Sequence, residues 1–260
     1  AVGGTLALSE VNTTTKAYID GTAQTQSNSL RVAAESVNTV TTSAKAATKG
    51  AKKQTAADKA AAPSKSEETL AKYKDQASTS DGSVEVAAAV AIANVNSVTQ
   101  AYVESTGTQT ATGAAAITSK ASNTSSVTAD GSSASGTVGV GAAVGVNVGV
   151  LLNQARVADN ASISSNGLTL AATMPTGGKN SFVTSATSGA GASNVGVAGA
   201  LGVNVLVNKT SATLEGDTDN GGFGAAVNAN GGDLIVDAAN TSESRLTVGA
   251  SVKPATASGP

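Results

Sequence analysis

The sequence contains no cysteine, no histidine and no tryptophan, and aromatic residues make up only 2% of its 260 residues. Without cysteine the chain forms no disulfide and offers no thiolate to a metal or a substrate. Without histidine it lacks the commonest general base and the commonest ligand of transition metals. We therefore expect that the protein is not an enzyme and has no catalytic residues, no cofactor and no metal site.

Charge is also scarce, since 13% of the residues are charged and the formal net charge is −2. A slightly acidic chain is a poor match for nucleic acid. No apolar run reaches the roughly 18 residues of a membrane-spanning helix, so we expect no transmembrane segment. The chain begins at Ala1 without a signal pattern, and we expect a mature segment or a piece of a longer chain.

The apolar residues that are present are mainly alanine and valine. Hydrophobic residues make up 40% of the chain, which is enough for one or two packed cores. A thick core usually needs leucine and aromatic side chains, whereas small side chains suit a thin and regular interior.

The chain repeats itself, and two short anchors mark each copy. The first anchor is an alanine followed by a variable and an apolar residue, at Ala17, Ala101, Ala155 and Ala212. The second is an apolar step at 30–32, 115–117, 168–170 and 234–236. Once a segment at 43–78 is removed, the period is about 54 residues. We expect one elongated domain, 1–260, with four copies at about 1–82, 83–135, 136–193 and 194–260.

Each copy opens with a long alternating stretch. From Val138 to Val150, valine and one alanine occupy every second position, and glycine, alanine or asparagine lies between them. A period of two indicates a strand. We expect the valine face to be buried, at roughly 1.5–3 kcal/mol per side chain. The small-residue face would let another sheet approach closely.

Shorter strands are expected after the long one, near 155–159, 168–172 and 181–186 in the third copy and near 234–237 and 245–250 in the fourth. Glycine-rich turn clusters at 164–167, 175–178 and 230–233 separate them.

These patterns predict an all-β fold, and we favour a repetitive β-solenoid in which each copy covers the open edge of the previous one. The alternative is a long-stranded antiparallel β-sandwich, because the alternation at 138–150 exceeds the usual strand length. A bend near Gly145 would reconcile the long stretch with a solenoid.

Residues 43–78 break the repeat and predict an α-helical insertion, because they are rich in Ala, Lys, Glu and Gln and lack Val and Ile. The segment is basic, whereas the rest of the chain is acidic. It could bind an acidic glycan, a membrane surface or the next subunit, although a solvated helix is the simpler interpretation. Its basic residues are Lys45, Lys49, Lys52, Lys53, Lys59, Lys65, Lys72 and Lys74.

One acidic cluster has the spacing of a calcium loop. Glu215, Asp217 and Asp219 precede an Asn-Gly-Gly turn, and Asp20 and Glu104 occupy related positions in earlier copies. A solvated turn is the simpler interpretation of these residues, and calcium is kept as an alternative.

Three motifs carry a resemblance to a known group of proteins. They are the AVGVNV step at 143–148, the related A-Y-[IV]-[DE] steps at 17–20 and 101–104, and the GGDLIVDA step at 231–238. The chain resembles the repeats of giant secreted bacterial adhesins of the leukotoxin-like and filamentous-haemagglutinin-like group. The resemblance implies a β-solenoid shaft at the cell surface that self-associates in adhesion, filaments or biofilm matrix. The alternative function is a binding module for acidic glycans, including cell-surface glycan, or for calcium.

Overall fold

The computed structural model describes residues 2–46, 84–133, 137–192, 195–216 and 223–254, and every regular element within them is a β-strand. The all-β expectation is confirmed. The strands form three sheets, and every strand pairing among the described residues is parallel.

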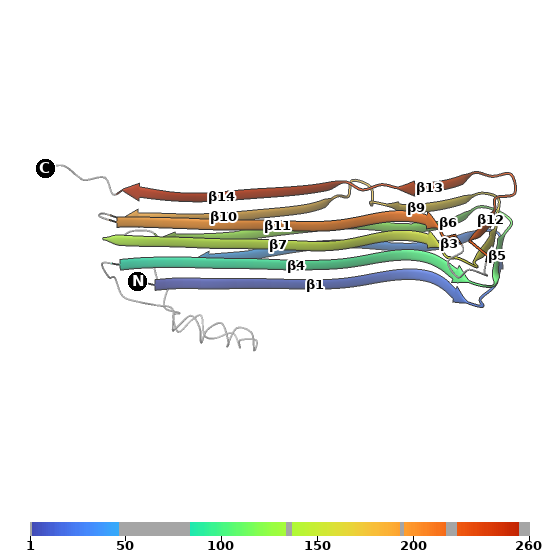
Figure 1. Ribbon diagram of the computed structural model, residues 1–260, viewed down its shortest axis with the longest axis horizontal. Helices are drawn as coiled ribbons and strands as arrows, with labels where there is room; N and C mark the ends of the chain where they lie inside the picture. Colours follow the sequence, from blue (N-terminus) through green and yellow to red (C-terminus); the bar gives the residue numbers. More distant parts are fainter. Residues whose placement is uncertain (1, 47–83, 134–136, 193–194, 217–222, 255–260) are drawn as a thin grey trace, which may run out of the picture.

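Sheet A consists of the four longest parallel strands, in the order β1-β4-β7-β11 (Figure 1). Their bounds are β1 Val2–Gly21, β4 Val84–Ser105, β7 Val138–Val157 and β11 Val195–Leu214.

Sheet B is small and consists of one short strand from each pass of the chain, in the order β12-β8-β5-β2. The strands are β2 Thr25–Ser27, β5 Thr108–Ala111, β8 Ser162–Ser164 and β12 Ala226–Asn228.

Sheet C lies behind sheet A and contains six strands. Strand β6 pairs with β3 on one side and with β9 and β10 on the other, and β13 and β14 follow at the far edge. The strands are β3 Leu30–Ala46, β6 Ala115–Ser133, β9 Leu168–Thr173, β10 Asn180–Ala192, β13 Leu234–Ala238 and β14 Ser242–Pro254.

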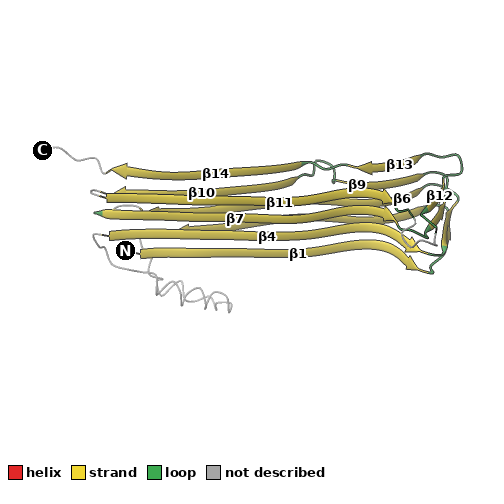
Figure 2. Cartoon of the chain, viewed as in Figure 1, coloured by secondary structure: helices red, strands yellow, loops and turns green. Residues whose placement is uncertain are grey.

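The chain follows the same path four times. It runs out along sheet A, turns through sheet B at one end of the molecule, and returns along sheet C (Figures 1 and 2). Each pass lies beside the one before it, so strands that are hydrogen-bonded neighbours come from successive passes.

Equivalent residues of the four passes lie in register. The first anchors pair directly, Ala17 with Ala101, Ala101 with Ala155 and Ala155 with Ala212. The second anchors pair likewise, in the order Leu30, Ala115, Leu168 and Leu234. The antiparallel sandwich is therefore wrong, because a chain that winds in one sense brings equivalent strands together in the same direction.

The interior between sheets A and C is thin, and small side chains line it on the sheet A side. The buried residues of β4 are alanine, valine, serine and threonine, and those of β7 are mainly glycine, alanine and asparagine. The expectation that the alternating valines form the core is wrong. The valines of β7 point outward, because sheet C approaches the inward positions of β7 so closely that these positions hold mainly glycine, alanine and asparagine.

Glycine is required at the closest approach of the two sheets. A Cβ atom on Gly141 would lie 2.3 Å from the carbonyl oxygen of Gly189 and 2.6 Å from that of Gly131. Phe182 is the largest fully buried side chain, and a Cβ on Gly149 would lie 2.4 Å from its ring. The close approach expected of the small-residue face therefore occurs, with backbone of sheet C against sheet A.

Asparagine side chains join the passes inside this thin core. The amide of Asn147, which is fully buried, accepts a hydrogen bond from Ser125 Oγ at 2.7 Å and donates to the carbonyls of Ser125 and Val183. In the next pass Asn204 donates to the carbonyls of Phe182 and Arg245. The asparagine of the GVNV step thus connects sheet A to sheet C.

A second series of asparagines runs across all four passes on sheet C. Asn38 Nδ2 donates to Asn123 Oδ1 at 2.7 Å, Asn123 Nδ2 to Asn180 Oδ1 at 3.1 Å, and Asn180 Nδ2 to Asn240 Oδ1 at 3.2 Å. Such a ladder satisfies buried amides only when the passes are in register.

Two expectations about irregular segments have different outcomes. The first is the bend expected near Gly145. Strand β7 runs through Gly145 without interruption over 20 residues, so the strand is not broken there. The expected helical insertion, 43–78, starts too early, because residues 43–46 belong to β3, where pairing with β6 continues to Ala46. Residues 47–78 lie outside the described residues.

Candidate interaction surface

The outward face of sheet A is an array of aliphatic side chains, which we call the aliphatic face. Its first eight rows run across the four strands, from the row of Val84, Val138 and Val195 to the row of Thr14, Val98, Leu152 and Lys209. The side chains come from even-numbered residues of β1, β4 and β7 and from odd-numbered residues of β11. The aliphatic members larger than alanine are Val2, Leu6, Leu8, Val84, Val86, Val90, Ile92, Val98, Val138, Val140, Val144, Val146, Val148, Val150, Leu152, Val195, Val197, Leu201, Val203, Val205 and Val207. The last three rows also contain six polar residues, Glu10, Asn12, Thr14, Asn94, Asn96 and Lys209.

These side chains are accessible, most of all on the edge strands. Leu6 and Leu8 on β1 are 73% and 68% exposed, and Leu201 on β11 is 56% exposed. Val90 and Val144, which lie between them on the inner strands, are half-buried by their neighbours. The leucines of the edge strands are thus more accessible than the valines between them.

The aliphatic face is large for an exposed surface. Four strands at about 4.8 Å and fifteen residues at about 3.3 Å give a footprint of roughly 900 Å². The largest apolar patch on a typical monomer covers about 300–600 Å², and larger ones usually mark an interaction site.

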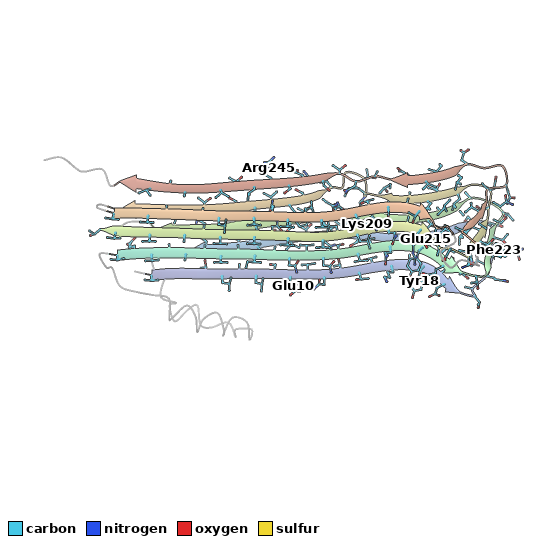
Figure 3. The ribbon with its side chains drawn as sticks, in the orientation of Figure 1. Glu10, Tyr18, Lys209, Glu215, Phe223 and Arg245 are labelled. Carbon is cyan, nitrogen blue, oxygen red and sulfur yellow. The ribbon has the colours of Figure 1, made fainter. Side chains whose placement is uncertain are left out.

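Only two charged side chains occur among the eight rows, Glu10 on β1 and Lys209 on β11. They lie on opposite edge strands of sheet A (Figure 3). The centre of the face is therefore uncharged, and the two charges at its edges have opposite sign.

An aromatic and ionic cluster follows the aliphatic face at the end nearer sheet B. Tyr18 and Tyr102 are register partners and stack with their ring centroids 5.2 Å apart. The guanidinium of Arg156 lies over the Tyr102 ring, 4.8 Å from its centroid, and forms ion pairs with Glu104 and Glu215. The cluster ties together the ends of β1, β4, β7 and β11.

Burial raises the pKa of Tyr102 above its ordinary value, and the neighbouring Glu104 carboxylate raises it further. The phenol therefore stays neutral and packs as a ring between Tyr18 and Arg156. This environment suits a structural contact, since Arg156 is already engaged by two carboxylates.

The outward face of sheet C has a different chemistry. Its exposed positions carry mainly hydroxyl groups, as at Thr39, Thr41, Ser43, Thr128, Thr187 and Thr247. Ion pairs cross it, between Lys45 and Asp130 at 3.5 Å and between Lys179 and Glu243 at 2.6 Å. The molecule thus has one aliphatic and one hydrophilic broad face.

The outermost strands have open edges. Among the described strands β1 pairs only with β4, and β11 pairs only with β7. On sheet C the corresponding strands are β3 on one side and β13 and β14 on the other. Core residues of the last pass are half exposed as a result, with Leu246, Val248 and Val252 at 48%, 47% and 48%.

The acidic residues of the calcium hypothesis do not form a site in the described part of the chain. Glu215 is held by Arg156 at 3.3 Å, and Asp217 and Asp219 lie outside the described residues. Asp20 and Glu104 are register partners, but no group of three potential metal ligands occurs among the residues that the structure describes.

Of the basic residues singled out in the sequence, Lys45 lies on β3 and pairs with Asp130. Lys49, Lys52, Lys53, Lys59, Lys65, Lys72 and Lys74 lie outside the described residues, so the glycan hypothesis has no described site.

Sequence reasoning missed the aliphatic face, although the first copy carries a signal for it. The positions that pair with the outward residues of β4 include Glu10, Asn12, Lys16 and Asp20. Charged residues are almost never fully buried without a partner. Alignment of the copies would therefore have placed the valines of later copies on the outside.

No helix in the described residues is long and apolar enough to cross a membrane. Comparison with protein-family models, with curated proteins and with solved structures gave no match for this chain.

Proposed function

We propose that the protein is a structural segment of a bacterial surface adhesin or filament, built as a β-solenoid of four coils and located outside the cell. Each coil is one pass through sheets A, B and C. The segment serves as a stiff scaffold, and its coils add to further coils at the open edges. The leukotoxin-like and filamentous-haemagglutinin-like resemblance of the GVNV and GGDLIVDA steps supports this class and location.

The observation that carries the proposal is the register of the four passes in sheets A and C. Strands β1, β4, β7 and β11 carry equivalent residues side by side, and the long strands of sheet C do the same. A new coil with the same pattern would find the same partners on β11 and β14 that these strands find on β7 and β10. Long open strand edges are templates for such pairing.

The hydrogen-bond pattern identifies which backbone groups a new coil would use. Gly21 O accepts from Thr106 N at 2.9 Å, so odd-numbered residues of β1 direct their backbone groups to β4. Because these groups alternate along a parallel strand, the even-numbered residues direct theirs to the open edge. Thr14 is such a residue, and its side chain is exposed on the outer face.

The test is concentration-dependent assembly of the purified chain, followed by sedimentation velocity and negative-stain electron microscopy. We expect linear particles whose length grows with concentration. Thr14→Pro removes one edge N–H and places a ring where an added strand would pair, so it should shorten the particles.

Thr14→Val is the matched control, because it keeps the edge N–H and should assemble like the parent chain. A parent chain that is monomeric at every concentration contradicts edge stacking. Assembly of Thr14→Pro indistinguishable from that of Thr14→Val contradicts it as well.

A further inference from the structure

The aliphatic face combines size, flatness and lack of charge in a way that end-to-end stacking does not use. Its side chains point away from the core along the normal of sheet A, so they stay exposed however many coils are added at the edges. Within the described residues, no element covers β1, β4, β7 and β11 on that side.

We propose that this face binds the same face of a second copy, forming a closed dimer with a twofold axis parallel to the strands. The dimer goes beyond the proposed scaffold role, because it adds a lateral contact that is distinct from growth at the edges.

The area fits this occupant. A footprint of roughly 900 Å² on each copy buries about 1,800 Å² in total, within the range of about 1,200–2,000 Å² for stable protein interfaces. Two twisted sheets pack face to face at about 10 Å through interdigitated aliphatic side chains. A self-complementary patch is what a twofold interface requires.

We choose the axis along the strands because it brings the two edges of opposite charge together. The two charges stay about 13 Å apart along the strand, beyond a Debye length of about 8–10 Å, so they add little binding energy. A twofold axis along the strands places β1 of one copy over β11 of the other, with the row order preserved. Glu10 then lies over the edge that carries the partner's Lys209, about four residues away along the strand. An axis across the strands would instead place β1 of one copy over β1 of the other. The two edges that carry Glu10 would then face each other, and so would the two edges that carry Lys209.

The same axis pairs two leucines across the interface. Leu6 and Leu201 belong to one row of sheet A, through Val90 and Val144. They lie at opposite edges of that row, three strand spacings or roughly 14 Å apart within one copy. In the dimer, Leu6 of each copy contacts Leu201 of the other.

The experiment uses this pairing. Dimerisation is measured by sedimentation velocity on the parent chain and on Leu6→Glu, Leu201→Lys and the double variant. Each sequence is also made as Thr41→Pro, which suppresses edge stacking at β3 without touching the aliphatic face, because Leu30 N donates to Ala114 O and odd-numbered residues of β3 therefore direct their backbone groups to the open edge. We expect a saturable dimer in the parent. Each single variant should weaken it at least about tenfold, because a charge is buried against leucine.

The double variant should recover dimerisation, because each new glutamate then faces a new lysine of the other copy. Val37→Glu is the matched control. Val37 is 64% exposed on the opposite broad face, and its replacement should leave the dimer unchanged. Circular dichroism of each variant checks that the outward substitutions leave the fold intact.

Three results would overturn the proposal. The first is a parent chain that stays monomeric in both backgrounds, and the second is an equal loss of dimer in Val37→Glu. The third is a double variant that remains as weak as the single variants. These outcomes are distinguishable from failure of the scaffold proposal, since edge stacking gives open-ended growth that depends on Thr14, whereas face pairing stops at a dimer.

Discussion

Replacing Gly141 by alanine should destabilise the protein strongly, because the added methyl group has no space. Its Cβ would lie 2.3 Å and 2.6 Å from two carbonyl oxygens of sheet C, those of Gly189 and Gly131. Both obstacles are backbone atoms, so no side-chain rotation relieves the clash, and the sheets must separate locally.

The expected cost is near the upper end of the range for overpacked cores, about 3 kcal/mol. If the sheets separate by about 0.5–1 Å at this point, the atoms that line the gap also lose about a quarter to a half of their dispersion energy. For a chain of this size, about 3 kcal/mol corresponds to a fall in melting temperature of roughly 6–12 °C.

The matched control is Gly199→Ala, on the outer face of β11. No atom lies within 4 Å of a Cβ at Gly199, and its register partner in β7 is already an alanine, Ala142. Loss of glycine restricts the unfolded chain, so this variant should be stabilised by about 0.4–1 kcal/mol.

The assay is thermal unfolding followed by circular dichroism at dilute concentration for the parent and both variants. Our assignment of inner and outer faces requires a large fall for Gly141→Ala and no fall for Gly199→Ala. Equal melting temperatures, or the reverse order, would refute the reasoning.

Three further predictions concern buried polar groups and charges. Asn147→Ala should lower the free energy of unfolding by about 1–3 kcal/mol, because Ser125 and the carbonyl of Val183 on sheet C lose their hydrogen-bond partner. Asn96→Ala, on the exposed face of sheet A, should change the free energy of unfolding little. Denaturant titration measures both variants. Arg156→Ala should cost about 1 kcal/mol and reduce the salt dependence of the melting temperature, since the arginine bridges two carboxylates. The hydrogen bond from Lys179 holds the pKa of Glu243 below its ordinary value of 4.5, so its stabilising effect is present above that pH and is lost as the pH falls through the folded-state pKa. Between about pH 5 and about pH 3 the melting temperature of Glu243→Gln should therefore fall less than that of the parent.

The turns and the repeated anchors were readable from the sequence, because turns depend on local chemistry and the anchors recur. Among the described residues four glycines have positive φ, and three of them, Gly167, Gly177 and Gly231, lie in the turn clusters that glycine, proline and asparagine predicted. The alanine anchors repeat because each occupies a fully or partly buried site that recurs in every pass.

The sequence of one copy alone does not tell which face of a long strand points toward the core. Val140 and Gly141 alternate in the same way whichever of them points inward, and the usual preference for burying valine gave the wrong answer. The deciding quantity is the spacing between sheets A and C, which depends on contacts such as Gly141 with Gly189 that are remote in the sequence.

The predicted start of a helix at residue 43 was wrong because of a similar competition. The residues at 43–46 contain two alanines and a lysine, which favour helix, but pairing of β3 with β6 continues to Ala46. Strand pairing across passes outweighs helix propensity there, because propensity differences are a few tenths of a kcal/mol per residue, about 0–0.7 for ordinary residues.

In-register stacking of successive passes is the central claim, and oxidative tyrosine cross-linking of the unmodified chain tests it most directly. The Tyr18 and Tyr102 rings stack with their centroids 5.2 Å apart although 102 − 18 = 84 positions separate them, and the chain has only three tyrosines. Brief photo-oxidation of dilute protein should yield dityrosine within single molecules, joining the tryptic peptides 17–31 and 75–120, and Tyr18→Phe should abolish it. A monomer that forms no link between these peptides, under conditions in which its tyrosines are oxidised, would contradict the stacked arrangement.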